Sequence, residues 1–306
     1  MFKPTKIIFE FMEERKKRVV KIFLPNDFLR NISTQQYKTM LLGNLSRYCC
    51  IFKINEINFY EIPDHWKQEG YERELIQDVL NYLITPQYIR KYLFQRKKTL
   101  SDVGILHPLN TPNHPVEKEN LEVQVSEGET MYREGVVIKI EGNDVFVDIG
   151  LNDPVKIQRR GDLKLYQVIN LKIVRKNQDF IVTPVDEGEI PYYWGYKVKF
   201  FDEPFKDILK MLKPADILVA TSKRGVNYKH YLREPSKFAF RDKKTISVFF
   251  GSRTTGLSEF FNSWDELEGA FDFIINCFDA PGTKSVRLEE AIPIALSILD
   301  TLSNFD

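Results

Sequence analysis

The residues most able to do chemistry lie near the carboxyl end of the chain, in residues 271–300. An apolar run, FDFIINC, is followed by a tight turn at 279–282, by Thr283 and Ser285, and by an apolar-striped helix over 288–302. A strand, a glycine turn and a helix entry present backbone N–H groups to a ligand in α/β proteins. This stretch is therefore a candidate binding site.

Phosphate is the first ligand to consider, because GTKS at 282–285 looks like the end of a nucleotide-binding loop. Such a loop needs Gly directly before Lys, and a second Gly five residues earlier. Here Thr283 intervenes and position 277 is Cys. The chain also contains no G-x-G-x-x-G pattern. Neither usual phosphate-binding motif is present, so the ligand must use a different glycine geometry.

Two other apolar runs, at 217–221 and 245–250, also end in small and polar residues. They are followed by TSKRG at 221–225 and by GSRTTGL at 251–257. Ligands of open α/β sheets bind at the carboxyl ends of the strands. We expect loops 221–225, 251–257 and 277–286 to converge on one pocket.

The first hundred residues alternate between strand and helix patterns. Strand-like runs at 18–24 and 50–60 flank a helix at 35–48, whose Tyr37, Met40 and Leu41 are predicted to share a face. This order implies a parallel strand pair with a right-handed crossover. The pattern returns from about residue 190, so residues 1–97 and 190–306 are predicted to form one α/β domain.

The middle third has a different texture. Residues 104–115, GILHPLNTPNHP, hold three prolines and cannot lie inside a helix. Residues 133–185 contain five short strand-like segments separated by turn residues, which predicts a small β-barrel. We therefore expect residues 98–189 to be an inserted barrel domain, with Phe146 and Tyr166 in its core rather than acting as base-stacking platforms.

Composition excludes several classes of protein. No run of about 18 apolar residues exists for a membrane span, and charges interrupt the N-terminus too early for a signal peptide. We expect a cytoplasmic protein. Cys49, Cys50 and Cys277 have no metal-type spacing, so neither zinc nor disulfides are expected. His107 and His114 are too few for a metal site, and we expect them to pack in their loop or to contact RNA.

Charge is unevenly distributed along the chain. The first 100 residues carry a net +7, whereas residues 101–190 carry −6, so a polyanion should bind the first segment. A solvated helix face is the alternative explanation for the basic cluster near residue 95. The candidate phosphate-contacting residues are Arg90, Lys91, Arg96, Lys97 and Lys98.

Eight segments together carry a family resemblance: LPNDFLRN, KTMLLGNLSRYCCIFKINEINFYE, TPQYIRKYLF, GILHPLNTPNHP, REGVV, TSKRG, VFFGSRTTGL and GTKSVRLEEAI. In this order they resemble the SPOUT superfamily, the trefoil-knotted methyltransferases that bind S-adenosylmethionine. The closer resemblance is to RNA methyltransferases with an oligonucleotide-binding (OB)-type barrel inserted into the knot domain. The similarity runs through nearly the whole chain.

The resemblance implies a C-terminal knot whose three loops surround the cofactor, and a homodimer with sites near its interface. The same residues could instead be ordinary turn glycines and helix caps. Two departures from the family are a more polar second loop and an acidic barrel. The residues it implies for the cofactor are Thr221, Ser222, Gly225, Gly251, Ser252, Gly256, Leu257, Cys277, Gly282, Thr283, Ser285 and Val286.

Arg287, Glu289 and Arg224 are the candidate catalytic residues. Methyl transfer requires an oriented nucleophile and, where a proton leaves, a base; Arg can offset negative charge on the acceptor. A first-turn salt bridge between Arg287 and Glu290 is the plainer alternative. The predicted function is methylation of a base nitrogen or ribose 2′-hydroxyl in structured rRNA or tRNA. The alternative is a non-catalytic RNA-binding or ribosome-assembly factor.

Overall fold

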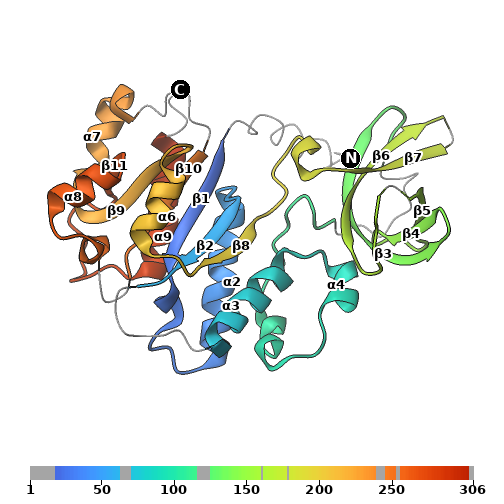
Figure 1. Cartoon of the computed structure of the whole chain (residues 1–306), viewed down its shortest axis with the longest axis horizontal. Coiled ribbons are helices and arrows are strands. Elements are labelled where there is room, and N and C mark those ends of the chain that lie inside the picture. The colour runs from blue at the N-terminus through green and yellow to red at the C-terminus, as the bar shows by residue number, and fades with distance from the viewer. Residues whose placement is uncertain are drawn as a thin grey trace, which may run out of the picture. The chain divides into compact units, whose positions relative to one another are not determined.

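The computed structural model describes two compact units. Among the described residues, 82–101 and 108–195 form one unit, here called the barrel unit, and the rest form the α/β unit. Figure 1 shows both, coloured along the chain. No helix in this part of the chain is long and apolar enough to cross a membrane. The described residues are 18–62, 70–115, 125–159, 161–177, 179–238, 245–252 and 256–302.

The α/β unit is built on a six-stranded parallel sheet in the order β11-β9-β10-β1-β2-β8. Ile22 in β1 faces Val248 of β10 on one side and Ile57 of β2 on the other, so the predicted parallel pair is confirmed. The strands are β1 (Val19–Pro25), β2 (Glu56–Tyr60), β8 (Lys197–Phe201), β9 (Asp216–Asn227), β10 (Thr245–Phe249) and β11 (Phe273–Asn276).

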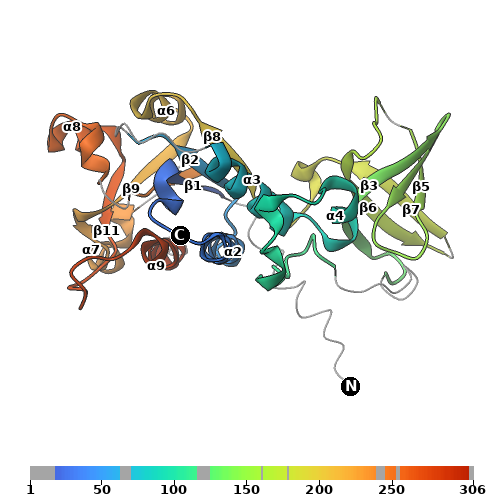
Figure 2. The same ribbon diagram turned by 90° about the horizontal axis from the view of Figure 1, so that it is seen from below.

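Helices cover both faces of this sheet, and the central strands are therefore continuous apolar runs. Figure 2 shows α6 and α8 on one face, and α2, α7 and α9 on the other. A cluster of aromatic side chains packs under α6, with Phe205 stacked on Phe260 at 4.0 Å. The helices are α2 (Gln35–Ile51), α3 (Gly70–Ile84), α6 (Phe205–Leu212), α7 (Tyr228–Arg233), α8 (Trp264–Ala270) and α9 (Leu288–Leu302).

Helix α2 differs from its prediction at its end and on its face. Thr34 caps its start, because the Thr34 side chain accepts a hydrogen bond from the Tyr37 backbone. The helix continues to Ile51 and closes where Lys53 takes φ 54° and Ile54 N–H bonds the Cys49 carbonyl, a left-handed end. The strand predicted from residue 50 therefore starts only at Glu56. Of the residues predicted to share a face, Leu41 is 5% exposed, whereas Tyr37 and Met40 are 43% and 45% exposed.

The barrel unit contains a five-stranded antiparallel sheet in the order β5-β4-β3-β6-β7, and its two edge strands also contact each other. The five strand-like segments of the sequence are thus confirmed. Val137, Val145 and Leu171 are fully buried in its core. The strands are β3 (Thr130–Glu141), β4 (Asp144–Asp148), β5 (Val155–Gln158), β6 (Val168–Lys176) and β7 (Asp179–Val185).

Two aromatic residues expected in the barrel core lie elsewhere. Tyr166 is 51% exposed. Phe146 is only half-buried, because it alternates with the fully buried Val145 and Val147 along β4 and so faces away from the core. The prediction failed because the apolar character of a residue alone does not show which face of the sheet its side chain occupies.

Helix α4 (Gln87–Leu93) belongs to the barrel unit. Its Tyr88 hydroxyl donates to the Glu134 carbonyl of β3 at 2.5 Å. Of the proline-rich segment, residues 104–107 belong to the α/β unit and 108–115 to the barrel unit. In the latter part Asn113 Nδ2 donates to the Ile84 carbonyl at 3.0 Å and His114 contacts the same oxygen. The predicted domain limits at residues 97 and 189 stay a prediction.

Candidate functional site

Residues 221–225, predicted as a loop, form a bulge inside β9 (Asp216–Asn227). β9 pairs with β11 through Ala220 and Ile274, and pairing resumes with Val226 and Ile275. Consecutive residues on β11 therefore face β9 residues on either side of the loop. The backbone groups of 221–225 take no part in the β9–β11 ladder and can face a ligand.

Gly225 closes this loop against the neighbouring strand. A Cβ at Gly225 would lie 2.5 Å from the Ile274 carbonyl oxygen and 2.7 Å from its carbon. These are backbone atoms that cannot move aside as a side chain would. The glycine is therefore required by close approach, which is more than an ordinary turn role.

The first loop contacts the end of β10, and the second loop contacts the segment that follows β1. The Thr221 hydroxyl donates to the Phe249 carbonyl at 3.0 Å, and the Ser252 hydroxyl donates to the Asp27 carboxylate at 2.9 Å. Gly251 and Ser252 are half-buried, Gly256 is exposed and Leu257 is buried. Arg253, Thr254 and Thr255, predicted for this loop, lie outside the described residues.

Two asparagines at strand ends contact these loops, Asn276 of β11 the first loop and Asn227 of β9 the third. Asn276 Nδ2 donates to the Lys223 carbonyl at 3.1 Å, and Asn227 Nδ2 donates to the Phe278 carbonyl at 3.4 Å. Cys277 is buried, and desolvation raises the pKa of its thiol to about 12. Gly282, Thr283 and Ser285 are exposed, and Val286 is half-buried.

The start of α9 places the predicted catalytic residues beside this loop. Arg287 is exposed, and its guanidinium makes no ion pair with any described residue. The salt bridge to Glu290 is not formed, because the Glu290 carboxylate instead accepts from the Arg287 backbone N–H at 2.9 Å. Glu290 is thus a helix cap. Glu289 is half-buried in the same first turn.

Arg224 points to a different helix. Its guanidinium lies 4.1 Å from the centre of the Trp264 ring on α8, and its backbone N–H bonds the Ser222 hydroxyl at 3.2 Å. The predicted catalytic residues therefore come from two places, the bulge inside β9 and the start of α9.

The five predicted RNA-contacting residues lie in the barrel unit, and their surroundings differ. Arg90 donates to the Thr85 and Leu83 carbonyls at 2.8 and 3.1 Å and covers the Tyr82 ring, so it is engaged with the end of α3. Lys91 is exposed and pairs with Asp148 at 3.3 Å. The remaining three, which lie after α4 and are exposed, are Arg96, Lys97 and Lys98.

Sequence reasoning missed Asp27 as a site residue. Asp27 follows β1, is fully buried, and holds Ser252 of the second loop. The neighbouring Tyr60 hydroxyl donates to the Phe250 carbonyl at 2.5 Å; burial and then the Asp27 charge raise the pKa of that hydroxyl. Its place after a buried strand is the signal that could have found it, because the other three loops have the same position.

The three loops fit S-adenosylmethionine in their chemistry. Residues 221–225 offer backbone groups outside the β9–β11 ladder, and the buried apolar residues Phe250, Leu257 and Cys277 lie in or next to the second and third loops. Glu289 supplies a carboxylate near the start of α9 for a positively charged ligand. No cluster of three or more metal-binding side chains occurs in the part of the chain that the structure describes.

Comparison with known proteins extends this description. A family model described as "Putative RNA methyltransferase" matches residues 19–299. The "28S rRNA (uridine-N(3))-methyltransferase" of Mus musculus is 29% identical over 91% of this chain and 75% of its own length. The protein of the same name from Drosophila melanogaster is 26% identical over 91% of this chain. The chain spans 61% of the length of that relative.

A solved structure also aligns with the chain. It is the SpoU methyltransferase AviRb from Streptomyces viridochromogenes in complex with the cofactor AdoMet, with 9% identity, a TM-score of 0.38, and coverage of 96% of this chain and 61% of its own. A TM-score this low supports no conclusion about the fold. The family assignment therefore rests on the match of the sequence to the family model.

Proposed function

We propose, from the premise that this chain belongs to the family described as putative RNA methyltransferases, that it is an S-adenosylmethionine-dependent methyltransferase of structured ribosomal RNA. The observation that carries the proposal is the convergence of three loops at the carboxyl edge of the parallel sheet. Asn276 bonds the Lys223 carbonyl, and Thr221 bonds the Phe249 carbonyl. Ligands of parallel α/β sheets bind at this edge.

The cofactor would be held by the three loops. It supplies a methyl group on a sulfonium, which is open to attack by a nitrogen or an oxygen. Residues 221–225 offer backbone acceptors and donors outside the β9–β11 ladder. Gly282, Thr283 and Ser285 are exposed, so the amides and hydroxyls of the third loop are available to the cofactor's polar groups.

The acceptor that we favour is N3 of a uridine, because the Mus musculus and Drosophila melanogaster relatives carry that activity in their names. Transfer would form an N–CH₃ bond while the S–CH₃ bond of the sulfonium breaks, which leaves the demethylated cofactor as a thioether, and it would release the N3 proton. Glu289, half-buried in the first turn of α9, is the group proposed to take that proton. Arg287 has no ion pair with any described residue, and its guanidinium would offset the charge that grows on the uracil oxygens.

The decisive experiment follows methyl transfer from labelled S-adenosylmethionine into ribosomal RNA, with mapping of the modified nucleotide. Arg287→Ala should lower kcat about 100-fold, the usual effect of removing one transition-state donor. Arg287→Lys keeps the positive charge, so its kcat should lie between those of the native chain and of Arg287→Ala. Calorimetry with the cofactor should give the same affinity for all three proteins.

Two results would contradict the proposal. One is calorimetry with no heat for S-adenosylmethionine or its demethylated product. The other is cofactor binding without incorporation into any RNA, which would favour a non-catalytic RNA-binding or ribosome-assembly factor.

Four finer features accompany the proposal. We propose a trefoil-knotted α/β unit, an OB-like barrel and a homodimer, in keeping with the SPOUT resemblance of the sequence, and a cytoplasmic location. Sedimentation of the purified chain tests the dimer, since a monomer at micromolar concentration would contradict it.

A further inference from the structure

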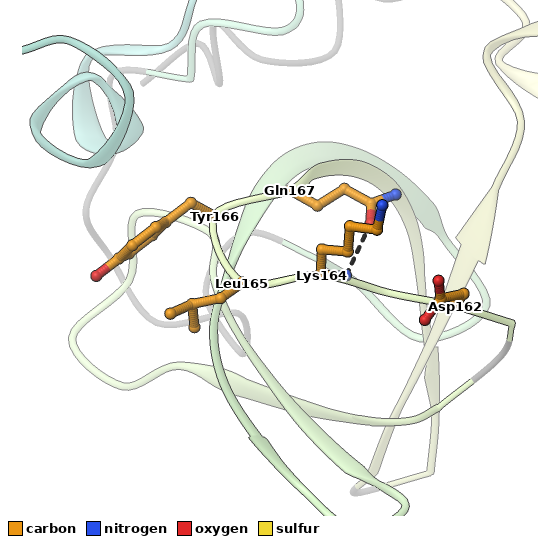
Figure 3. A pocket seen from close by; sticks show the side chains of 5 residues that line it. All are labelled: Asp162, Lys164, Leu165, Tyr166 and Gln167. Carbon is orange, nitrogen blue, oxygen red and sulfur yellow. Dashed lines mark hydrogen bonds between the residues drawn. The ribbon is translucent and has the colours of Figure 1, made fainter.

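The turn between β5 and β6 exposes a small group of apolar side chains to water. Leu165 and Tyr166 are each 51% exposed, and Val168 beside them is 39% exposed. In Figure 3 the Leu165 and Tyr166 side chains project from one side of the turn, while Gln167 lies on the other. An open hollow of about 500 Å³ is lined by Asp162 and residues 164–167. Adjacent exposed apolar groups of this kind mark binding surfaces.

The backbone holds Tyr166 in an unfavourable conformation. Its φ is 61°, in the left-handed region where a Cβ is crowded. At nearby turns of the barrel, Gly142 and Gly161 take this conformation, as glycine does without strain. A tyrosine here lowers the stability of the fold, and strain of this kind is characteristic of functional positions.

The turn is nevertheless firmly held. Tyr166 N–H donates to the Val137 carbonyl at 2.8 Å, and Val137 N–H donates to the Gln167 carbonyl at 3.0 Å. The Lys164 backbone N–H is bonded by the Gln167 side chain at 2.9 Å. Tyr166 is thus presented on a fixed backbone, so little ordering entropy is lost when a ligand binds.

A second ring and positive charge extend this surface. The Tyr92 ring of α4 lies 6.1 Å from that of Tyr166, tilted by 25°, and its hydroxyl is fixed by Asp148 at 2.9 Å. Lys91 Nζ lies 4.7 Å from the Tyr92 ring centre. Lys164, in contrast, extends beside Gln167 on the other side of the turn (Figure 3). Aromatic faces next to a lysine match a nucleotide, whose base stacks and whose phosphate is anionic.

We propose that Tyr166, together with Tyr92, forms a stacking platform for an unpaired base of the RNA substrate. A base in a duplex is already stacked, so the platform selects single-stranded segments. An apolar protein surface would make no use of Lys91 beside the Tyr92 ring. The inference rests on the proposed function only in taking the partner to be the RNA that is methylated.

The test measures binding of the full-length chain, without cofactor, to a labelled oligouridylate and to a hairpin duplex of equal charge by fluorescence anisotropy. Tyr166→Ala should weaken single-strand binding about tenfold, the usual effect of losing one base–aromatic stack. Tyr166→Phe should bind as the native chain does. Tyr37→Ala removes another exposed tyrosine, 43% exposed on α2, and should change nothing.

Tyr166→Gly separates stacking from folding. Glycine relieves the φ of 61°, so the Tm should stay equal or rise while single-strand affinity falls as in Tyr166→Ala. If Tyr166→Gly and Tyr166→Ala bound the single strand with native affinity, the platform would be overturned. A protein partner would then be the better explanation of the exposed ring. An equal loss for the single strand and the duplex would overturn the platform as well. Tyr166-dependent binding without any methyl transfer would leave the platform standing and the enzymatic proposal refuted.

Discussion

The α/β unit and the barrel unit both bury charged side chains, Asp27 in the first and Arg133 in the second, but their candidate sites differ. In the α/β unit the candidate catalytic residues Arg224 and Arg287 are exposed, beside loops that leave a parallel sheet. In the barrel unit, Arg133 is 1% exposed and donates to the Ile149 carbonyl at 2.8 Å. Burial raises the pKa of the adjacent Glu134 to about 7.

This difference follows from the two sheet types. A parallel sheet brings the carboxyl ends of its strands to one edge, so loops far apart in sequence meet there. A small antiparallel barrel has a single core, and charged groups that enter it must be hydrogen-bonded. The candidate site of the α/β unit therefore consists of loops at one sheet edge, whereas that of the barrel unit is centred on a strained exposed ring, Tyr166.

The largest effect should come from Gly225→Ala. Its Cβ would meet the Ile274 peptide at 2.5 Å, so we expect a loss of about 3 kcal/mol in unfolding free energy and no cofactor binding by calorimetry. Gly269→Ala in α8, where a Cβ meets nothing within 4 Å, is the control. Gly150→Ala clashes with Tyr88 in the barrel, and should destabilise the protein without changing cofactor affinity. Loss of cofactor affinity in Gly150→Ala would break the comparison.

The next effect concerns pH and two buried groups of the barrel unit. Desolvation raises the pKa of Glu134 from 4.5 to about 7. Between these values the folded state holds a proton that the unfolded state has lost, so stability falls as pH rises. Desolvation lowers the pKa of His114 from 6.5 to about 4; there the unfolded state holds the extra proton, so stability rises with pH.

The two contributions should nearly cancel in the native chain between about pH 4.5 and 6.5. In Glu134→Gln the free energy of unfolding should rise by about 3 kcal/mol between about pH 4 and 6.5, because only the His114 contribution is left. In His114→Gln it should fall by about 3 kcal/mol between about pH 4.5 and 7, because only the Glu134 contribution is left. Urea unfolding at a series of pH values measures both slopes. If the free energy of unfolding changed with pH in the same way in both variants, Glu134 and His114 would not be buried in solution.

A smaller effect is expected from the contact between Asp27 and Ser252. Asp27→Asn weakens a hydrogen bond to a buried carboxylate, so we expect about 2 kcal/mol of destabilisation and weaker cofactor binding, because Ser252 belongs to the second loop. Ser252→Ala and the double variant complete a thermodynamic cycle by thermal unfolding. Strict additivity would mean that the two side chains do not interact.

The smallest effect should come from Trp264→Phe. The Arg224 guanidinium lies 4.1 Å from the Trp264 ring, and an exposed cation–π contact is worth about 0.5–1 kcal/mol. We expect a two- to fivefold change in kcat/KM for RNA, with cofactor affinity unchanged. A much larger loss would show that Trp264 itself contacts the substrate.

Much of this organisation could be predicted from the sequence, element by element. The apolar runs before Thr221, Gly251 and Cys277 located three strands and their loops. The five strands of the barrel were visible because turn residues separate them. The end of α2 was predicted wrongly, because it depends on a left-handed residue at Lys53, which no composition signal marks. The exposure of Tyr166 also required the structure.

The sequence by itself determined the strands, the loops and the family, because periodicity and motif order are properties of a one-dimensional chain. The tertiary structure decided which of these meet. Gly225 touches the Ile274 peptide across the sheet, Asp27 holds Ser252 across 225 residues of chain, and Tyr166 stacks beside Tyr92. These contacts arise from strand register and packing, which join residues distant in sequence, so local pattern cannot specify them.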